Sequence, residues 1–376
     1  MTNADAANAD IDKAELFAAI NEGNSELVKT LVANKGVSPD SLDEHCTSAL
    51  QLAAFRGHYD VCKVLLECGA KVNSTDHPHG YTSIVFGALS GNTRVVRLLL
   101  DAGANVHKRT AKDRDALDMA AFTGQFKCVC TMKLYVSYKR FERFTASEVP
   151  DQKMLSIQAS NQLHTLSADP IIHPVYIFLF IYDHPKLLEE KKAVLRALEG
   201  VMDSYIASKE IDELLAVKMC IILNTVKSAF SAVNESDLAN PRDALLRLSK
   251  NIFLANANGT LNLDSFIHSV IIKFPNTRSV ILQQFMKEVY ESKADTPLAN
   301  AYDIICRILM GSHMVNAESF CDACGDWRVP LKQCASCRNA RYCSHRCQRL
   351  HWALHKRYCA SKQVKARDAQ NTKEQS

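Results

Sequence analysis

Residues 47–69 read Thr-Ser-Ala-Leu-Gln-Leu-Ala-Ala-Phe-Arg-Gly-His-Tyr-Asp-Val-Cys-Lys-Val-Leu-Leu-Glu-Cys-Gly, a small-residue segment and an amphipathic segment, each closed by a glycine. The first glycine recurs at intervals of 34, 34 and 33 residues, as Gly23, Gly57, Gly91 and Gly124, and the second recurs as Gly36, Gly69 and Gly103. A fixed period of this length is typical of solenoids with one supersecondary unit per repeat. We therefore predict stacked units of helix, glycine turn, helix and glycine cap.

The repeats occupy residues 1–144 in this interpretation. Three units are clear, at about 13–37, 47–73 and 82–106, and a fourth opens at Asp115. The fourth lacks the closing Gly-Ala-x-Val of the others. The sequence therefore leaves open whether its second helix is a regular repeat element or a cap.

These units resemble ankyrin repeats. Thr47-Ser-Ala-Leu-Gln-Leu-Ala-Ala stands where that family has Thr-Pro-Leu-His-Leu-Ala-Ala, although no unit keeps the Pro or the His. The resemblance implies that the repeats bind partner proteins through hairpin tips and a concave face. The tips at 73–81 and 107–115 are the expected contact points, because loops on a rigid scaffold commonly carry function.

The composition changes after the repeats. No glycine occurs between Gly124 and Gly200, and seven of the ten prolines lie between positions 150 and 297. Amphipathic patterns broken by prolines predict an all-helical middle module over residues 145–318, with apolar stripes that form its core rather than a cofactor site. The predicted helices span about 186–208, 210–233, 241–255, 262–274, 277–293 and 298–312.

Composition also bounds the class of protein. Apolar residues make up 47% of the chain and charged residues 23%, which is typical of soluble globular proteins. The longest apolar run, Ile171 to Tyr182, is short of the roughly 20 residues that cross a bilayer, and the amino terminus carries no secretory signal. We expect a cytoplasmic protein, with the cilium or the nucleus as further locations.

Seven of the fourteen cysteines fall within residues 321–359. In a reducing compartment such a cluster indicates metal binding rather than disulfides. Four pairs supply eight donors, enough for two closed, structural zinc sites with tetrahedral ligand shells. The pairs are Cys321-x2-Cys324, Cys334-x2-Cys337, Cys343-x3-Cys347 and His355-x3-Cys359.

The spacing within the pairs predicts local structure. The x2 pairs suit tight turns, and the x3 pairs suit one face of two short helical turns. His351 is a rival ligand, but we favour His355 because it lies four residues before Cys359. Spacing alone does not decide which pairs share an ion.

Residues 319–360 resemble a MYND-type zinc finger in every interval, and Ala340-Arg-Tyr-Cys-Ser and Trp352-Ala-Leu-His-Lys match its flanking residues. That family interleaves its pairs in a two-zinc cross-brace. The resemblance implies one site formed by Cys321, Cys324, Cys343 and Cys347 and another formed by Cys334, Cys337, His355 and Cys359. It also implies binding of proline-rich peptides at Gln348 and Trp352, with the alternative that Trp352 only packs between the zinc sites.

The carboxyl end is basic. Residues 321–376 contain twelve Lys and Arg against four Asp and Glu. We do not expect nucleic-acid binding, because no interleaved aromatic residues or base-reading helix accompany these charges. Residues 361–376 are predicted to be a disordered polar tail.

The order of parts resembles, over nearly the whole length, the ankyrin-repeat and MYND-domain-containing protein 2 group. This resemblance implies a non-enzymatic adaptor linked to ciliary signalling, with partners such as an FK506-binding-type prolyl isomerase. A nuclear corepressor and a MYND-containing lysine methyltransferase are the alternatives. The methyltransferase fits less well, because its glycine-rich catalytic domain has no counterpart in the glycine-poor middle.

Overall fold

The computed structural model describes residues 3–145, 154–207, 212–235, 240–255, 261–276, 278–295, 301–315 and 320–373. The chain divides into two compact units, Met1–Ser137 and Tyr138–Ser376. The sequence places this boundary near residue 144. It lies earlier because α9 (Lys139–Glu142) packs in the second unit, where Phe141 is fully buried and Arg140 donates a hydrogen bond to Ser204.

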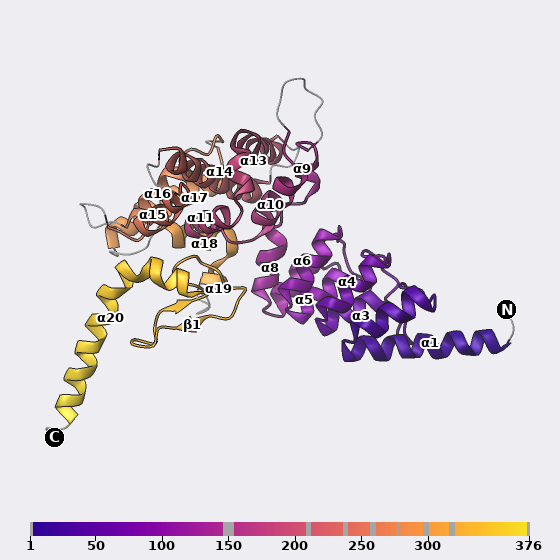
Figure 1. Cartoon of the computed structure of the whole chain (residues 1–376). Helices are drawn as coiled ribbons and strands as arrows, with labels where there is room; N and C mark the ends of the chain where they lie inside the picture. The colour runs from indigo at the N-terminus through magenta and orange to yellow at the C-terminus, as the bar shows by residue number, and fades with distance from the viewer. Residues whose placement is uncertain are drawn as a thin grey trace. The chain divides into compact units, whose positions relative to one another are not determined.

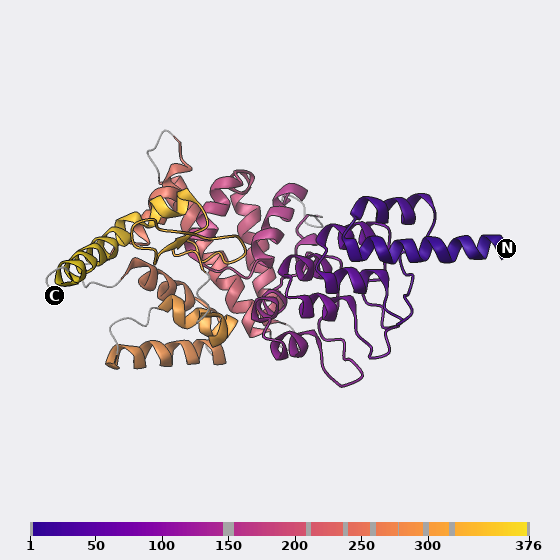
Figure 2. The same ribbon diagram turned by 90° about the horizontal axis from the view of Figure 1, so that it is seen from below.

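The first unit is a stack of helix pairs, as the glycine period predicts (Figures 1 and 2). The fourth pair is complete, so its second helix is a regular element although no glycine closes it. The pairs are α1 (Asn3–Glu22) with α2 (Ser25–Lys29) and the π-helical η1 (Thr30–Asn34), α3 (Ala49–Arg56) with α4 (Tyr59–Glu67), α5 (Ser83–Ser90) with α6 (Thr93–Asp101), and α7 (Ala116–Phe122) with α8 (Phe126–Lys133).

Each glycine turn has a conformational reason. Gly57 and Gly91 end α3 and α5 with φ of 75° and 71°, in the left-handed region that side chains disfavour. The residue that follows Gly91, just before the next helix begins, also has a structural role. Asn92 caps α6 by accepting from the backbone N–H groups of Arg94 and Val95, and its amide donates to the Gly57 carbonyl at 2.9 Å. One side chain thus begins a helix and ties two repeats together.

After α9, the second unit continues with a series of further helices. These are α10 (Ile157–Ala168), α11 (Pro174–Asp183), α12 (Lys186–Glu189), α13 (Lys191–Ile206), α14 (Glu213–Asn234), α15 (Asp243–Asn251), α16 (Asn262–Ile271), α17 (Val280–Asp295), α18 (Ala301–Met310) and α19 (Ser312–Val315). The middle module is all-helical in its described residues. The sequence missed α10 and α11, which precede the first helix that it predicts in this part.

Helix α14 is long and apolar enough to cross a membrane by length and composition, with a mean hydropathy of 1.4. However, 72% of that window is buried inside the unit, and α14 packs against α11, α13, α15 and α16. Lys218 on α14 is fully buried and donates a hydrogen bond to the Ser167 carbonyl near the end of α10. The hydrophobicity of α14 is therefore that of a core helix.

The chain ends in a small β-hairpin and a long helix. β1 (Lys332–Gln333) pairs antiparallel with β2 (Arg341–Tyr342), with Lys332 opposite Tyr342, and α20 (His345–Lys373) follows. The helix extends to Lys373, into the part of the chain for which the sequence predicts a disordered polar tail, residues 361–376. A helix started by the finger propagates readily into a sequence of good helix formers, since each added residue needs only one further hydrogen bond.

We expect Asn92→Ala to destabilise the repeats more than Asn24→Ala. Both changes remove a helix cap, which is worth about 1 kcal/mol, but Asn92 also donates the bond to Gly57, worth about 1 kcal/mol more. Hydrogen exchange of α3 to α6, measured by mass spectrometry on the full chain, reports the difference. Equal protection in the two variants contradicts a role for Asn92 between repeats.

Candidate metal centre

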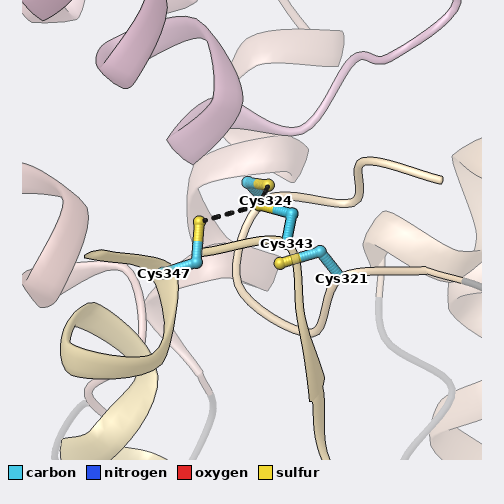
Figure 3. A group of neighbouring side chains, drawn as sticks. All are labelled: Cys321, Cys324, Cys343 and Cys347. Atoms are coloured by element: carbon cyan, nitrogen blue, oxygen red, sulfur yellow. Dashed lines mark hydrogen bonds between the residues drawn. The ribbon is translucent and has the colours of Figure 1, made fainter. Parts of the chain in front are cut away.

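Four cysteine sulfurs from three segments converge in the finger. Cys321, Cys324, Cys343 and Cys347 place their Sγ atoms within 4.8 Å of one another (Figure 3). The first two lie before β1, Cys343 follows β2, and Cys347 lies in the first turn of α20. This is the first of the two ligand sets that the resemblance implies.

The second set joins the loop between β1 and β2 to later turns of α20. Cys334, Cys337, His355 and Cys359 also place one donor atom each within 4.8 Å of one another. The structure therefore brings His355, and not His351, to the three cysteines. The pairs interleave along the chain, because the first and third pairs share one set and the second and fourth share the other.

The donor spacings fit zinc. A tetrahedral zinc with Zn–S bonds of about 2.3 Å and Zn–N bonds of about 2.0 Å separates two sulfurs by about 3.8 Å and a sulfur from a nitrogen by about 3.6 Å. The Sγ atom of Cys343 lies 3.6 Å from that of Cys324 and 3.4 Å from that of Cys347. His355 Nε2 lies 3.3 Å from Cys334 Sγ and 3.5 Å from Cys337 Sγ.

These distances exclude disulfides, in which the sulfurs are about 2.05 Å apart. All fourteen cysteines are free thiols. Four thiolate or imidazole donors in each set satisfy the preferred coordination number of zinc and leave no position open for a substrate. The finger thus has two clusters that can bind two zinc ions, and the chemistry of both is structural.

The two Cys-x2-Cys turns share one backbone design. The N–H of Gly325 donates to the Cys321 carbonyl at 2.8 Å, and the N–H of Arg338 donates to the Cys334 carbonyl at 2.9 Å. Both residues that close the turns have positive φ, 69° for Gly325 and 55° for Arg338. The predicted tight turns are therefore present, and the second accepts a side chain in the left-handed region.

A single helix, α20, carries Cys347, His355 and Cys359. The sequence predicts two short helical turns, which is wrong because the residues between the x3 pairs are helical as well. Ser344 starts the helix by accepting from the N–H of Cys347. One rigid element therefore holds ligands of both sites at fixed spacing.

His351 is not a member of either ligand set and packs against neighbouring side chains instead. Its Nδ1 lies 3.0 Å from the hydroxyl of Tyr342, and its ring packs edge-on against Phe253 at 4.9 Å. Burial lowers the pKa of His351 to about 4, so the ring is neutral at physiological pH. The ring joins the finger to the end of α15.

The finger is built into the helical unit through Arg328. Its guanidinium lies 2.6 Å from the buried carboxylate of Asp169 and donates to the Tyr176 hydroxyl at 3.0 Å. Burial raises the pKa of Tyr176, so its hydroxyl stays protonated and donates in turn to Asp169. Asp326, whose carbonyl accepts from the N–H of Cys321, holds the same guanidinium at 3.1 Å. A ligand loop and the end of α10 thereby share one charge network.

A second contact is made by Gly325. A Cβ at this position would lie 2.8 Å from the Tyr302 hydroxyl and 3.2 Å from the Cβ of His173. Burial lowers the pKa of His173 to about 3, and the neutral ring accepts from the N–H of Val175 to begin α11. No local pattern in the sequence points to these partners, because Tyr302 and His173 lie 19 and 148 residues before Cys321.

The predicted peptide contacts lie on the outer face of α20. Gln348, Arg349 and Trp352 line an open depression of about 300 Å³. The indole of Trp352 is 43% exposed, and its ring lies 5.8 Å from that of the ligand His355. Trp352 therefore covers one side of the second site and offers another side to solvent.

A second basic residue of the finger, Arg346, forms an ion pair within the unit. Arg346 donates to both carboxylate oxygens of Asp183, at 2.9 and 2.6 Å. Those hydrogen bonds lower the pKa of Asp183. This pair ties the start of α20 to the end of α11, so Arg346 is occupied by a carboxylate.

Comparison with known families agrees with this architecture. Models of ankyrin repeats match residues 4–76 and 84–132, and the model of the MYND finger matches residues 321–359. The chain thus carries ankyrin repeats followed by a MYND finger. Both are non-catalytic protein-interaction modules.

Among curated proteins, Dauer abnormal formation protein 25 of Caenorhabditis elegans is 28% identical over 361 residues, which cover 93% of this chain and 90% of that protein. Ankyrin repeat and SAM domain-containing protein 6 of Mus musculus is 36% identical over 28% of this chain. Human palmitoyltransferase ZDHHC17 is 43% identical over 19% of it. The last two matches span only 12% and 11% of those proteins.

We expect two zinc ions per chain, and thiol labelling should report them. Cys46 is exposed and should react first, whereas burial raises the pKa of Cys62, Cys128 and Cys130 to about 12 and keeps those thiols inert. Chelation should release seven more reactive thiols, those of the finger. Labelling by an alkylating agent, followed by mass spectrometry, counts them, and reactivity of the finger cysteines before chelation contradicts metal ligation.

We expect Gly325→Ala to loosen the finger from the helical unit more than Gly311→Ala. Both positions have positive φ, so each change strains the backbone by about 1–2 kcal/mol. Only the new Cβ at 325 meets neighbours, since nothing lies within 4 Å at 311. Thermal unfolding followed by Trp327 and Trp352 fluorescence compares the variants, and equal midpoints contradict close packing of the first turn.

Proposed function

We propose that this protein is a non-catalytic adaptor that joins partner proteins through its ankyrin repeats and its MYND finger. The observation that supports this most directly is the presence of two interaction modules in separate compact units. In addition, both metal clusters have four protein donors, a chemistry that suits structure and not turnover. Partners of the repeats would meet the hairpin tips and the concave face.

The finger would take proline-rich peptides at Gln348 and Trp352. An exposed indole offers a flat apolar face for proline rings, and proline-rich segments bind aromatic-lined grooves with little loss of entropy because they are already extended. The neighbouring Gln348 supplies an amide that can bond to a peptide carbonyl. This proposal is supported by the open depression that these two side chains line with Arg349.

We further propose a cytoplasmic role in signalling or in the trafficking of signalling proteins, with the cilium as one location. The support is the resemblance of the whole chain to ankyrin and MYND adaptors, together with the near full-length similarity to a worm protein named for abnormal dauer formation. An FK506-binding-type prolyl isomerase is a candidate partner on the same ground.

We expect Trp352→Ala to weaken binding of a proline-rich peptide at least tenfold while both zinc ions remain, because the indole is not a ligand. Gln348→Ala should act in the same direction with a smaller effect. Titration of a labelled proline-rich peptide by fluorescence anisotropy measures affinity, and elemental analysis measures zinc.

The matched control is Tyr358→Ala, which removes another exposed aromatic side chain of α20, 63% exposed, that does not line the depression. Its peptide affinity should be unchanged. Affinity should also respond weakly to added salt, unlike that of a phosphate binder. Loss of zinc in the Trp352 variant, or unchanged peptide affinity, contradicts the proposed peptide site.

A further inference from the structure

The first helices of three consecutive repeats expose equivalent apolar positions. Counted back from the turn glycines Gly57, Gly91 and Gly124, two positions of the helix are apolar in every repeat. All six side chains are at least partly exposed, and Phe55 and Phe122 are 48% and 75% exposed. We call this set the apolar ladder: Leu52 and Phe55 on α3, Phe86 and Leu89 on α5, and Met119 and Phe122 on α7.

The ladder is continuous with the middle hairpin tip. Phe55 contacts Phe86 edge-on at 5.9 Å, and Phe86 contacts Tyr81 at 5.6 Å. Tyr81 in turn stacks on His77 at 5.0 Å. Helix α5 packs against α3 on one side and against α7 in the next repeat. An exposed apolar surface that spans several elements is typical of an interaction site.

The hairpin tips beside the ladder carry opposite charges at its two ends. Residues 40–46, the acidic tip, contain Asp40, Asp43 and Glu44 and no Lys or Arg. Residues 107–114, the basic tip, contain four basic residues and one acidic residue: Lys108, Arg109, Lys112, Asp113 and Arg114. The tip between them has neither Lys nor Arg and presents rings instead.

The charges of the basic tip are only partly neutralised. Arg109 pairs with Asp118 at 3.2 Å, whereas Lys108 and Lys112 are exposed and have no ion pair within the described residues. The guanidinium of Arg114 lies over the ring of Phe122 at 5.2 Å, so charge and apolar ladder meet there. The backbone N–H of Ala111 donates to the His79 carbonyl, which joins the basic tip to the ring-bearing tip.

We propose that this face binds an extended segment of a partner protein that has an acidic cluster at one end, apolar side chains in the middle and a basic cluster at the other. The acidic cluster would lie on Lys108 and Lys112, the apolar side chains on the ladder, and the basic cluster on the acidic tip. Complementary charge favours one orientation of the partner segment along this face. It disfavours segments that carry the wrong sign of charge at either end.

The repeat stacking sets the length of that segment. Packed helices lie about 8–10 Å apart, so tips two repeats apart are separated by about 20 Å. An extended chain advances about 3.3–3.6 Å per residue. The two charge clusters of the partner should therefore be about six residues apart. This inference rests on the proposed adaptor function and specifies the partner of the repeats.

The test is selection of a displayed library of random peptides, about sixteen residues long, on the immobilised full chain. We expect a class of enriched peptides with the two charge clusters and an apolar centre. Lys108→Glu/Lys112→Glu should reduce their affinity at least tenfold, and Phe55→Ala should reduce it as well. The matched control Lys63→Glu/Lys133→Glu, which makes the same charge change on α4 and α8, should bind as the unmodified chain does.

Two outcomes overturn the inference. One is that the expected class of peptide is absent. This holds if no peptide is enriched, or if every enriched peptide lacks a charge cluster or the apolar centre. The other is a binding class whose affinity survives Lys108→Glu/Lys112→Glu. Binding of the proline-rich peptide to the finger is measured on the same preparations. If that binding persists, only the inference about the repeats fails, and if both are absent the adaptor proposal fails with it.

Discussion

The structure of the carboxyl end depends on one metal cluster, in which cysteines from separate segments of the chain come together to bind a zinc ion. These are Cys321, Cys324, Cys343 and Cys347. The finger has about forty residues, and its single hairpin has strands of only two residues each. Such a segment cannot bury enough apolar surface to fold alone. Zinc supplies the missing free energy, because a structural zinc in such segments is worth an apparent 10–16 kcal/mol at neutral pH. The loop that holds Cys321 and Cys324 also contacts the helical unit through Gly325 and Arg328. Metal binding and docking of the finger are therefore coupled.

This coupling gives the helical module a role that its sequence does not indicate. Asp169, His173 and Asp183 all face the finger, and they come from the end of α10 and from the two ends of α11. The module thus provides a packing surface that fixes the orientation of α20. The proposed peptide site on α20 is better preorganised on this surface than on a finger at the end of a flexible chain. The repeats form the second binding face in the other compact unit.

Local patterns account for what the sequence predicted well. The helix pairs follow from glycines that end helices in the left-handed region, a property of single residues. The zinc donors follow from residue type and spacing. Helix α11 was missed because it is apolar on nearly all sides, so that no amphipathic period marks it, and α10 was missed for want of a strong stripe. The full length of α20 is not evident from the sequence, because the residues after Cys359 are mostly polar and form no apolar stripe.

By itself, the sequence determined the repeat period with three of the repeats, the helical class of the middle module and the eight donors of the finger, because these depend on period, composition and spacing. Only the structure showed that the fourth helix pair is complete. The sequence also favoured His355 over His351 as a ligand, because His355 lies four residues before Cys359. The tertiary structure agrees, because it brings His355 to the three cysteines and places Phe253 and Tyr342 against His351. Only the tertiary structure decided that Arg328 meets Asp169, a contact across about 160 residues. Complementarity between groups so far apart leaves no pattern in a single chain.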